Sequence, residues 1–264
     1  MTQERGSLHR DAAPERHDSV LVILLGASNL SRGHRALVRH LEAALAPRPT
    51  QFLTAAGPGR GYCAKGGFLY VTYPPIPQGG ILEASRARSR EAHTVALITD
   101  IGNDIMQGVT GEEIVQCLDA LIAELRALGA RVVVTAIPVD PKKDLNEAQF
   151  RLLRAIFFPR SPVDRRQARA AVRTVNDFLL RQQSADVHVV HDLYRFTGWD
   201  KIHYGIFKAN LAWSRVAEEL LRCLGLPAPR RITRLRMLAS VARHLIRLLT
   251  RDLLRSSRAD PGFF

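Results

Sequence analysis

The chain has few cysteines, and their spacing fits neither a disulfide framework nor a metal site. Its 264 residues include three cysteines, Cys63, Cys117 and Cys223, which stand far apart along the sequence. Disulfide scaffolds carry an even number of cysteines at short spacing, and structural zinc sites take their ligands from closely spaced pairs. The sequence therefore predicts no disulfide and no metal site. Cys63 lies in a glycine-rich segment and is the one thiol in an unusual setting.

Long apolar runs are also absent. The unbroken apolar stretch at 20–25 is far shorter than the run of about 18 residues that a membrane-spanning helix needs. The polar, mixed-charge residues before it do not resemble a signal peptide. Aromatic residues make up only 6% of the chain, and no nucleic-acid-binding motif is present, which disfavours nucleic acid as a partner. The sequence therefore favours a cytoplasmic protein.

Positive charge is abundant but unevenly distributed. Of the net charge of +13, residues 230–258 supply +8, from nine arginines and one aspartate. Apolar residues recur there at helical spacing and form one stripe, made of Leu235, Leu238, Ala242, Leu245, Leu249 and Leu253, while arginines gather on another face. A basic amphipathic helix is typical of proteins that bind an anionic membrane surface, here at its inner face, or a partner helix. A helix docked on its own domain with its arginines outward fits equally well.

The chain divides into three parts by composition. Residues 1–17 are polar, charged and without periodicity, which predicts a disordered leader. Residues 18–225 alternate apolar runs with helical patterns and form one α/β domain. Residues 226–264 form the basic amphipathic C-terminal helix.

Within 18–225, apolar runs that end at glycine, proline or aspartate predict the strands of a parallel sheet. We expect five strands, at 20–25, 50–56, 94–101, 131–137 and 187–190. Helices are expected between them, at about 34–46, 111–128, 167–183 and 206–224. Residues 138–165 look irregular, with Phe157-Phe158-Pro159 as an apolar lid or packing insert.

Polar residues follow several of these strands. Ser28 comes directly after the first strand, the turn 57–61 after the second and Asn103 after the third. Asp200 and His203 lie in the loop that follows the fifth. Because the carboxyl ends of parallel strands meet at one edge of the sheet, where ligands bind in open α/β folds, we expect these residues to lie close together.

Asp and His three residues apart on one loop can pair through the imidazole Nδ1–H. This pairing leaves Nε2 free to take a proton from the Ser28 hydroxyl, which a serine needs to become a nucleophile. Asn103 can offer its amide N–H to a developing oxyanion, and Gly59 and Ser28 their backbone N–H groups. Each residue also has a simpler interpretation: Ser28, Asn29 or Asp200 could cap a helix, Asn103 could belong to a turn, and His203 could lie on the surface.

In order and approximate spacing, Gly26-Ala27-Ser28, the turn at Gly59, Gly102-Asn103-Asp104 and Asp200-Lys201-Ile202-His203 resemble the four sequence blocks of the SGNH (GDSL-type) hydrolases. This resemblance implies a flavodoxin-like three-layer α/β/α sandwich that cleaves acyl esters without metal or cofactor. It also implies that Ser28 is the nucleophile, that His203 is the base oriented by Asp200, and that Gly59 and Asn103 line the oxyanion hole. The substrate would be a small-molecule or lipid-like ester.

The chain departs from the family pattern at three places. Ala27 stands where the family has the aspartate that braces the active-site loops, and Asn29 and Asp104 are the candidates to replace it. Gly57 competes with Gly59 for the oxyanion hole, and Tyr204 stands where proline is frequent. Two alternatives to an esterase therefore stay open: an O-acyltransferase using the same site, and an inactive binding protein with the same fold.

Overall fold

A computed structural model describes residues 18–68, 71–90, 92–139, 145–227, 230–250 and 262–264 of the chain. The leader expected at 1–17 lies outside the described residues, as does the 251–261 part of the expected basic helix. Within the described ranges, no helix has the length and apolar character needed to cross a bilayer.

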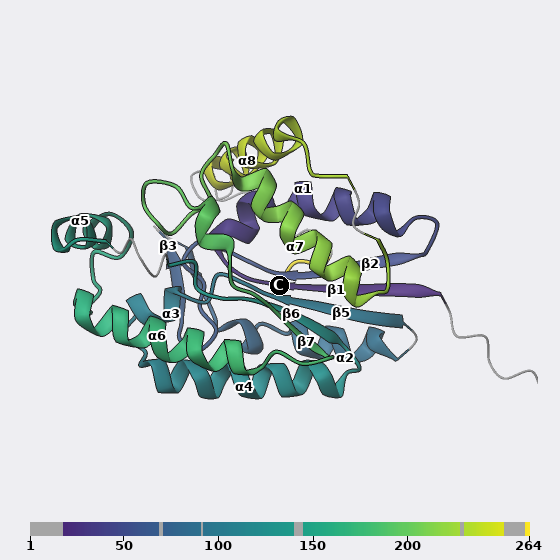
Figure 1. Ribbon diagram of the computed structural model, residues 1–264, viewed down its shortest axis with the longest axis horizontal. Coiled ribbons are helices and arrows are strands. Elements are labelled where there is room, and N and C mark those ends of the chain that lie inside the picture. Colours follow the sequence, from purple (N-terminus) through teal and green to yellow (C-terminus); the bar gives the residue numbers. More distant parts are fainter. Residues whose placement is uncertain (1–17, 69–70, 91, 140–144, 228–229, 251–261) are drawn as a thin grey trace, which may run out of the picture.

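A five-stranded parallel sheet forms the centre of the fold (Figure 1). Its strands are β1 (Ser19–Leu25), β2 (Thr50–Ala55), β5 (Ala92–Ile98), β6 (Arg131–Thr135) and β7 (Val187–Val190). They lie in the order β2-β1-β5-β6-β7, and every neighbouring pair is parallel. Six of the seven residues of β1 are buried, as its unbroken apolar run predicts for a strand covered on both faces.

Helices cover both faces of this sheet (Figure 1). One face carries α1 (Ser28–Leu45), α7 (Ala209–Cys223) and, outside them, α8 (Arg234–Leu248); the other carries α2 (Ile81–Ser89), α4 (Gly111–Ala127) and α6 (Arg165–Arg181). Successive residues of β1 enter different cores, Ile23 on the α4 side and Leu24 on the α1 side. The predicted flavodoxin-like three-layer sandwich is therefore confirmed, with the strand order typical of that fold.

The remaining elements lie at or near the carboxyl edge of the sheet, or lead into it. They are the hairpin β3 (Gly66–Phe68) and β4 (Val71–Tyr73), the short helix α3 (Asn103–Met106), the helix α5 (Glu147–Phe157), and 3-10 helices at Ile76–Gln78 and Leu193–Phe196. The expectation of irregular structure at 138–165 was wrong over α5. That helix starts in a capping box, since Asn146 and Gln149 each accept the other's backbone N–H, at 2.8 and 3.1 Å.

The first helix also starts six residues earlier than predicted, at Ser28 instead of His34. Gly33 lies inside it, where a glycine ordinarily weakens a helix. A Cβ at Gly33 would come within 2.2 Å of the Trp213 indole nitrogen of α7. The glycine is therefore needed for close approach between α1 and α7 and does not end the helix.

The basic helix docks on its own domain, but through an unexpected stripe. Met237, Ser240 and Val241 of α8 are buried against α1, and the Ser240 hydroxyl donates to the Arg32 carbonyl oxygen at 2.9 Å. The predicted apolar stripe faces outward instead: its members Leu235, Leu238, Leu245 and Leu249 are 77%, 38%, 53% and 58% exposed. Docking and an exposed apolar stripe thus coexist on one helix.

His244 lies on the docked side of α8. Burial, and next the charges of Arg32 on α1 and Arg247 on α8, lower the pKa of this imidazole to about 4. The ring is therefore neutral at neutral pH. In an unfolded chain a histidine has a pKa of about 6.5, so between about pH 6.5 and 4 the unfolded state binds more protons than the folded state. Stability then rises with pH across this window and is lost as the pH falls.

We predict that His244→Phe removes part of this pH dependence. The free energy of unfolding, measured by urea denaturation from pH 7 to pH 4.5, should fall by about 1 kcal/mol less in the variant than in the wild type, since solvent screens a partly exposed ring. The exposed His93 supplies the control, because His93→Gln should keep the wild-type slope. Equal slopes for all three proteins would contradict the prediction.

Candidate active site

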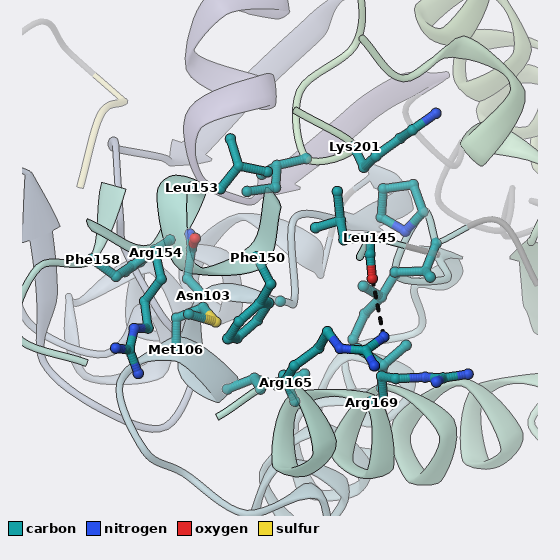
Figure 2. Close-up of a pocket in the computed structure, with 18 of the residues that line it drawn as sticks. Asn103, Met106, Leu145, Phe150, Leu153, Arg154, Phe158, Arg165, Arg169 and Lys201 are labelled. Atoms are coloured by element: carbon teal, nitrogen blue, oxygen red, sulfur yellow. Dashed lines mark hydrogen bonds between the residues drawn. The ribbon is translucent and has the colours of Figure 1, made fainter. Parts of the chain in front are cut away.

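A cavity of about 370 Å³ opens at the carboxyl edge of the sheet, between the start of α1 and the helices α5 and α6 (Figure 2). Ser28 and Asn103 line it, together with an apolar surface that includes Met106, Phe150 and Leu153. This volume lies in the range of small-molecule sites, which combine apolar walls with a few polar groups. The cavity is therefore large enough for a substrate of modest size.

Ser28, His203 and Asp200 form a hydrogen-bonded chain at this cavity. The Ser28 Oγ lies 3.0 Å from the His203 Nε2, and the His203 Nδ1 lies 2.7 Å from the Asp200 Oδ2. Ser28 and His203 are 175 residues apart in sequence. With the proton on Nδ1, the imidazole donates to Asp200 and its Nε2 can accept the Ser28 proton.

Asp200 is also fixed by its own loop. Its Oδ1 accepts the backbone N–H groups of Ile202 at 3.1 Å and of His203 at 2.9 Å, in a turn where Lys201 adopts a φ of 56°. Burial by itself raises the pKa of Asp200, but the hydrogen bonds from the ring and backbone of His203 outweigh it and hold the pKa below its usual value. The carboxylate therefore stays ionised beside the imidazole.

An aromatic ring from α5 covers the imidazole. The Phe157 ring meets the His203 ring edge-on, with centroids 5.4 Å apart and an interplanar angle of 63°. Phe158, the next residue, lines the cavity. The segment predicted as an apolar lid or packing insert thus contacts the histidine directly.

The predicted oxyanion residues are only partly brought together. Asn103 is buried and lines the cavity, and its Nδ2 donates to the Arg60 carbonyl oxygen at 2.9 Å. Gly59 does not line this cavity; it adopts a φ of +71°, and its carbonyl oxygen accepts from the Gln107 side chain at 2.9 Å. Gly57 lines a different cavity, between α1 and α8. Gly59 directly precedes Arg60, whose carbonyl oxygen accepts the hydrogen bond from Asn103, but Gly59 itself lies outside the cavity lining.

Asp104 braces the glycine-rich loop from inside. Its side-chain oxygens accept the backbone N–H groups of Tyr62, Cys63 and Ala64 at 2.7, 2.9 and 3.0 Å. Burial raises the pKa of Asp104 although these donors oppose the rise. Burial, and next the Asp104 charge, also raise the pKa of the Cys63 thiol, which keeps it protonated and a poor nucleophile.

The residue that sequence reasoning missed is Asp100. Its Oδ2 accepts the backbone N–H groups of Ala27 at 2.9 Å and Leu30 at 3.0 Å, and its Oδ1 accepts from the Asn29 side chain at 3.0 Å. It thereby caps α1 from a neighbouring strand end, whereas neither Ser28 nor Asn29 caps the helix with its own side chain. Its φ of 60° is one that aspartate tolerates better than most residues.

Asn29 joins this brace to the histidine loop. Its Nδ2 also donates to the Ile202 carbonyl oxygen at 3.2 Å, and its Oδ1 accepts the Tyr204 backbone N–H at 2.9 Å. A proline at 204 would lack that N–H. Asn29 therefore links the start of α1, which carries Ser28, to the loop that carries His203. Asp100 could have been noticed in the sequence as the second residue after a buried strand, at the same edge as Ser28.

Comparison with known proteins gives no matching family model and no matching curated relative. Among solved structures, the chain is similar to the psychrotrophic esterase EstA from Pseudoalteromonas sp., with 13% identity over 79% of this chain and 100% of that one, and a TM-score of 0.47. It is also similar to a member of the lipolytic G-D-S-L family from Veillonella parvula (15% identity, 76% and 97% covered, TM-score 0.45). A third similar structure is the aryl esterase of M. smegmatis (12% identity, 75% and 97% covered, TM-score 0.49). At these low identities, function has to be argued from the residues of this chain.

We predict that Asp100→Asn destabilises the fold. Asparagine keeps the tolerance for positive φ, but its NH2 group cannot accept one of the three hydrogen bonds. One buried donor is then left unsatisfied, at a cost of about 2 kcal/mol in the free energy of unfolding, measured by urea denaturation. Asp119→Asn, at an exposed site on α4, is the control and should change stability by less than about 0.5 kcal/mol. Equal free energies of unfolding for the Asp100 variant and the wild type would show that these hydrogen bonds do not stabilise the fold.

Proposed function

We propose that this protein is a serine-dependent hydrolase of acyl esters in which Ser28 is the nucleophile. The observation that carries the proposal is the 3.0 Å separation of the Ser28 Oγ and the His203 Nε2, with Asp200 on the other side of the ring. A serine needs an adjacent base of this kind, and the base needs a third group to orient it.

In the proposed reaction, the Ser28 Oγ forms a bond to the ester carbonyl carbon while its proton passes to the His203 Nε2. The bond to the leaving alcohol then breaks, and the imidazolium gives that proton to the departing oxygen. A water molecule then attacks the acyl carbon while one of its protons passes to the His203 Nε2. The bond to the Ser28 Oγ breaks, the imidazolium returns the proton to that oxygen, and the acid leaves. Asp200 stays ionised throughout and stabilises the imidazolium.

The developing oxyanion would be held by N–H donors near Ser28. Ser28 is the first residue of α1, and its backbone N–H has no acceptor among the described residues, as is usual in the first turn of a helix. The positive end of the helix dipole adds to the attraction for negative charge. Asn103, which lines the cavity, contributes its side-chain amide. Gly59 does not line the cavity and is proposed as the third donor on the sequence resemblance alone.

We predict that a fluorophosphonate probe labels the wild-type protein on Ser28 and fails to label Ser28→Ala. His203→Gln should slow labelling by about 100-fold or more, the usual value of a general base. Ser31→Ala is the matched control one turn along α1: its hydroxyl donates to the Ala27 carbonyl oxygen, and the variant should label like the wild type. Absence of labelling in the wild type, read by mass spectrometry of the peptide, would favour the inactive binding protein.

An acyltransferase would use the same Ser28 and would label equally. The two activities separate in their products when a series of model esters of increasing chain length is supplied with and without an alcohol acceptor. Free acid as the main product in both conditions supports the hydrolase. Transfer to the alcohol in preference to water identifies the O-acyltransferase alternative.

A second proposal concerns α8. We propose that its outward apolar stripe binds an anionic lipid surface. Leu245, Ile246 and Leu249 are 53%, 60% and 58% exposed, and the exposed Arg243 lies on the adjoining part of the same helix. Apolar side chains beside arginine are the pattern of helices that lie in a membrane interface, where the arginines meet lipid phosphates. Docking through Met237 and Val241 leaves this stripe available.

We predict that the full chain sediments with vesicles of phosphatidylglycerol and phosphatidylcholine, and that Leu245→Gln combined with Leu249→Gln largely abolishes this binding. The control is Leu180→Gln, which removes an equally exposed leucine (49%) from α6. Binding should weaken at high salt because salt screens the arginines. Equal sedimentation of the double variant and the wild type would refute lipid binding by this stripe, and would leave a partner helix as its occupant.

A further inference from the structure

Residues 262–264, Gly-Phe-Phe, lie beside β2 (Figure 1). The Thr54 backbone N–H donates to the Gly262 carbonyl oxygen at 2.8 Å, and the Phe264 N–H donates to the Thr54 carbonyl oxygen at 2.9 Å. Thr54 and Phe263 thereby form a parallel bridge. Because β2 lies at one edge of the five-stranded sheet, these residues bind backbone groups of the kind that an edge strand leaves open.

The two phenylalanines anchor this segment on opposite faces of the sheet. Phe263 packs against the core on the α1 side, and Phe264 packs against the core on the α4 side. The Phe263 ring also meets the His34 ring edge-on, with centroids 4.8 Å apart. Side chains that alternate between two faces are typical of a β-strand. Residues 262–264, which we call the edge segment, therefore act as a short strand added to β2.

The edge segment contacts Arg60, the residue after Gly59 in the glycine-rich loop that follows β2. Arg60 is 1% exposed, and its Nη1 donates to the Phe264 carbonyl oxygen. Its Nε donates to the Pro74 carbonyl oxygen at 3.3 Å, and its Nη2 lies so close to Gly79 that a Cβ there would come within 2.4 Å. A buried cation is costly unless its N–H groups have acceptors. The two carbonyl oxygens therefore fix the guanidinium in place.

The backbone of Arg60 in turn holds Asn103. The Arg60 carbonyl oxygen accepts a hydrogen bond from the Asn103 Nδ2 at 2.9 Å, and the Arg60 N–H donates to the Gly57 carbonyl oxygen at 3.2 Å. An amide NH2 group carries two N–H donors, so Asn103 can give its second one to an oxyanion. The position of the Arg60 backbone thus sets the orientation of a proposed oxyanion donor.

We infer that Arg60 is a positioning residue of the proposed oxyanion hole, and that the edge segment holds Arg60 in place. The contacts run from the Gly262 and Phe264 backbone, bound to β2, to the Arg60 guanidinium, and from the Arg60 carbonyl oxygen to the Asn103 amide. The inference rests on the proposed ester-hydrolase function and extends that site to a distant part of the chain. Arg60 does not line the cavity, so it acts through Asn103.

A single substitution can release the edge segment. Gly262 adopts a φ of +83°, and a Cβ there would lie 2.8 Å from the Phe52 carbonyl oxygen of β2. Valine tolerates this φ poorly, so Gly262→Val should detach the segment. Gly129→Val is the matched control, because Gly129 has a φ of +76° but a Cβ there would have nothing within 4 Å. The backbone strain is then similar, while no contact with another part of the chain is broken.

Amide hydrogen exchange, followed residue by residue, tests the contacts without any need for activity. In Gly262→Val, the Thr54 amide and the Arg60 amide should each exchange about tenfold faster than in the wild type. In Gly129→Val, both should keep the wild-type rate. Wild-type exchange at Thr54 in Gly262→Val would show that the edge segment is not bound to β2. Wild-type exchange at Arg60 would show that the segment does not hold the loop, and either result overturns the inference.

Kinetics with 4-nitrophenyl octanoate test whether the loop acts through Asn103, with kcat expressed per Ser28 titrated by the fluorophosphonate probe. Gly262→Val and Arg60→Met should each lower kcat about tenfold and leave KM within about twofold, a part of the 100-fold or more that loss of an oxyanion donor costs. Arg60→Lys should lose less kcat than Arg60→Met, because its ammonium group can still donate to the Phe264 carbonyl oxygen. Gly129→Val should keep the wild-type kcat.

A double variant separates positioning from general stability. Asn103→Ala should lower kcat about 100-fold, and adding Gly262→Val to it should change kcat by less than about twofold, because the donor that the segment positions is already gone. Independent effects that multiply would overturn the inference. A wild-type kcat in Gly262→Val, with the Thr54 amide released, would overturn it as well.

These failures differ from a failure of the proposed function. If the wild type turns over the ester and is labelled on Ser28, the hydrolase proposal survives whatever the Gly262 and Arg60 variants do. If the wild type shows neither turnover nor labelling, the hydrolase proposal fails, and with it the role of Arg60 at an oxyanion hole.

Discussion

The carboxylate of Asp100 fixes where α1 begins, and the geometry of the candidate site depends on that position. The first N–H groups of a helix have no acceptors within it. Here one oxygen, Asp100 Oδ2, two residues after the end of β5, accepts the backbone N–H groups of both Ala27 and Leu30. An anion at this end of a helix is favoured by the helix dipole as well as by the hydrogen bonds. Because the backbone N–H groups of Ala27 and Leu30 are both bound to Asp100, the backbone of Ser28 between them is fixed at the cavity wall.

Ala27 and Tyr204, where the chain departs from the SGNH pattern, belong to the same hydrogen-bond network. Ala27 is fully buried and contributes its backbone N–H to Asp100, so the bracing carboxylate comes from another strand. Asn29 extends the same network to the Tyr204 N–H, a donor that a proline would not supply. The start of α1 and the loop that carries His203 are therefore linked through side-chain hydrogen bonds that are independent of a carboxylate at residue 27.

The helix α5 gives the site its cover. Phe157 meets the imidazole, while Phe150 and Leu153 form part of the cavity wall. An apolar cover of this kind keeps water from the His203–Asp200 pair, and electrostatic interactions are stronger where water is excluded. Residues of α6, among them Ala168 and Val172, line another side of the same cavity.

The sequence alone determined the layers of the fold and the residues that meet at its edge. Unbroken apolar runs fix buried parallel strands, and such strands bring Ser28 and His203 to one edge. The sequence did not determine α5, whose periodicity is short, nor the start of α1, which depends on an acceptor 70 residues away. The orientation of α8 was likewise decided by tertiary contact, because the stripe that contains Met237 packs against α1 and the leucine stripe stays exposed. Local patterns record which faces are apolar, but only tertiary structure selects the partner for each face and supplies hydrogen bonds between distant segments.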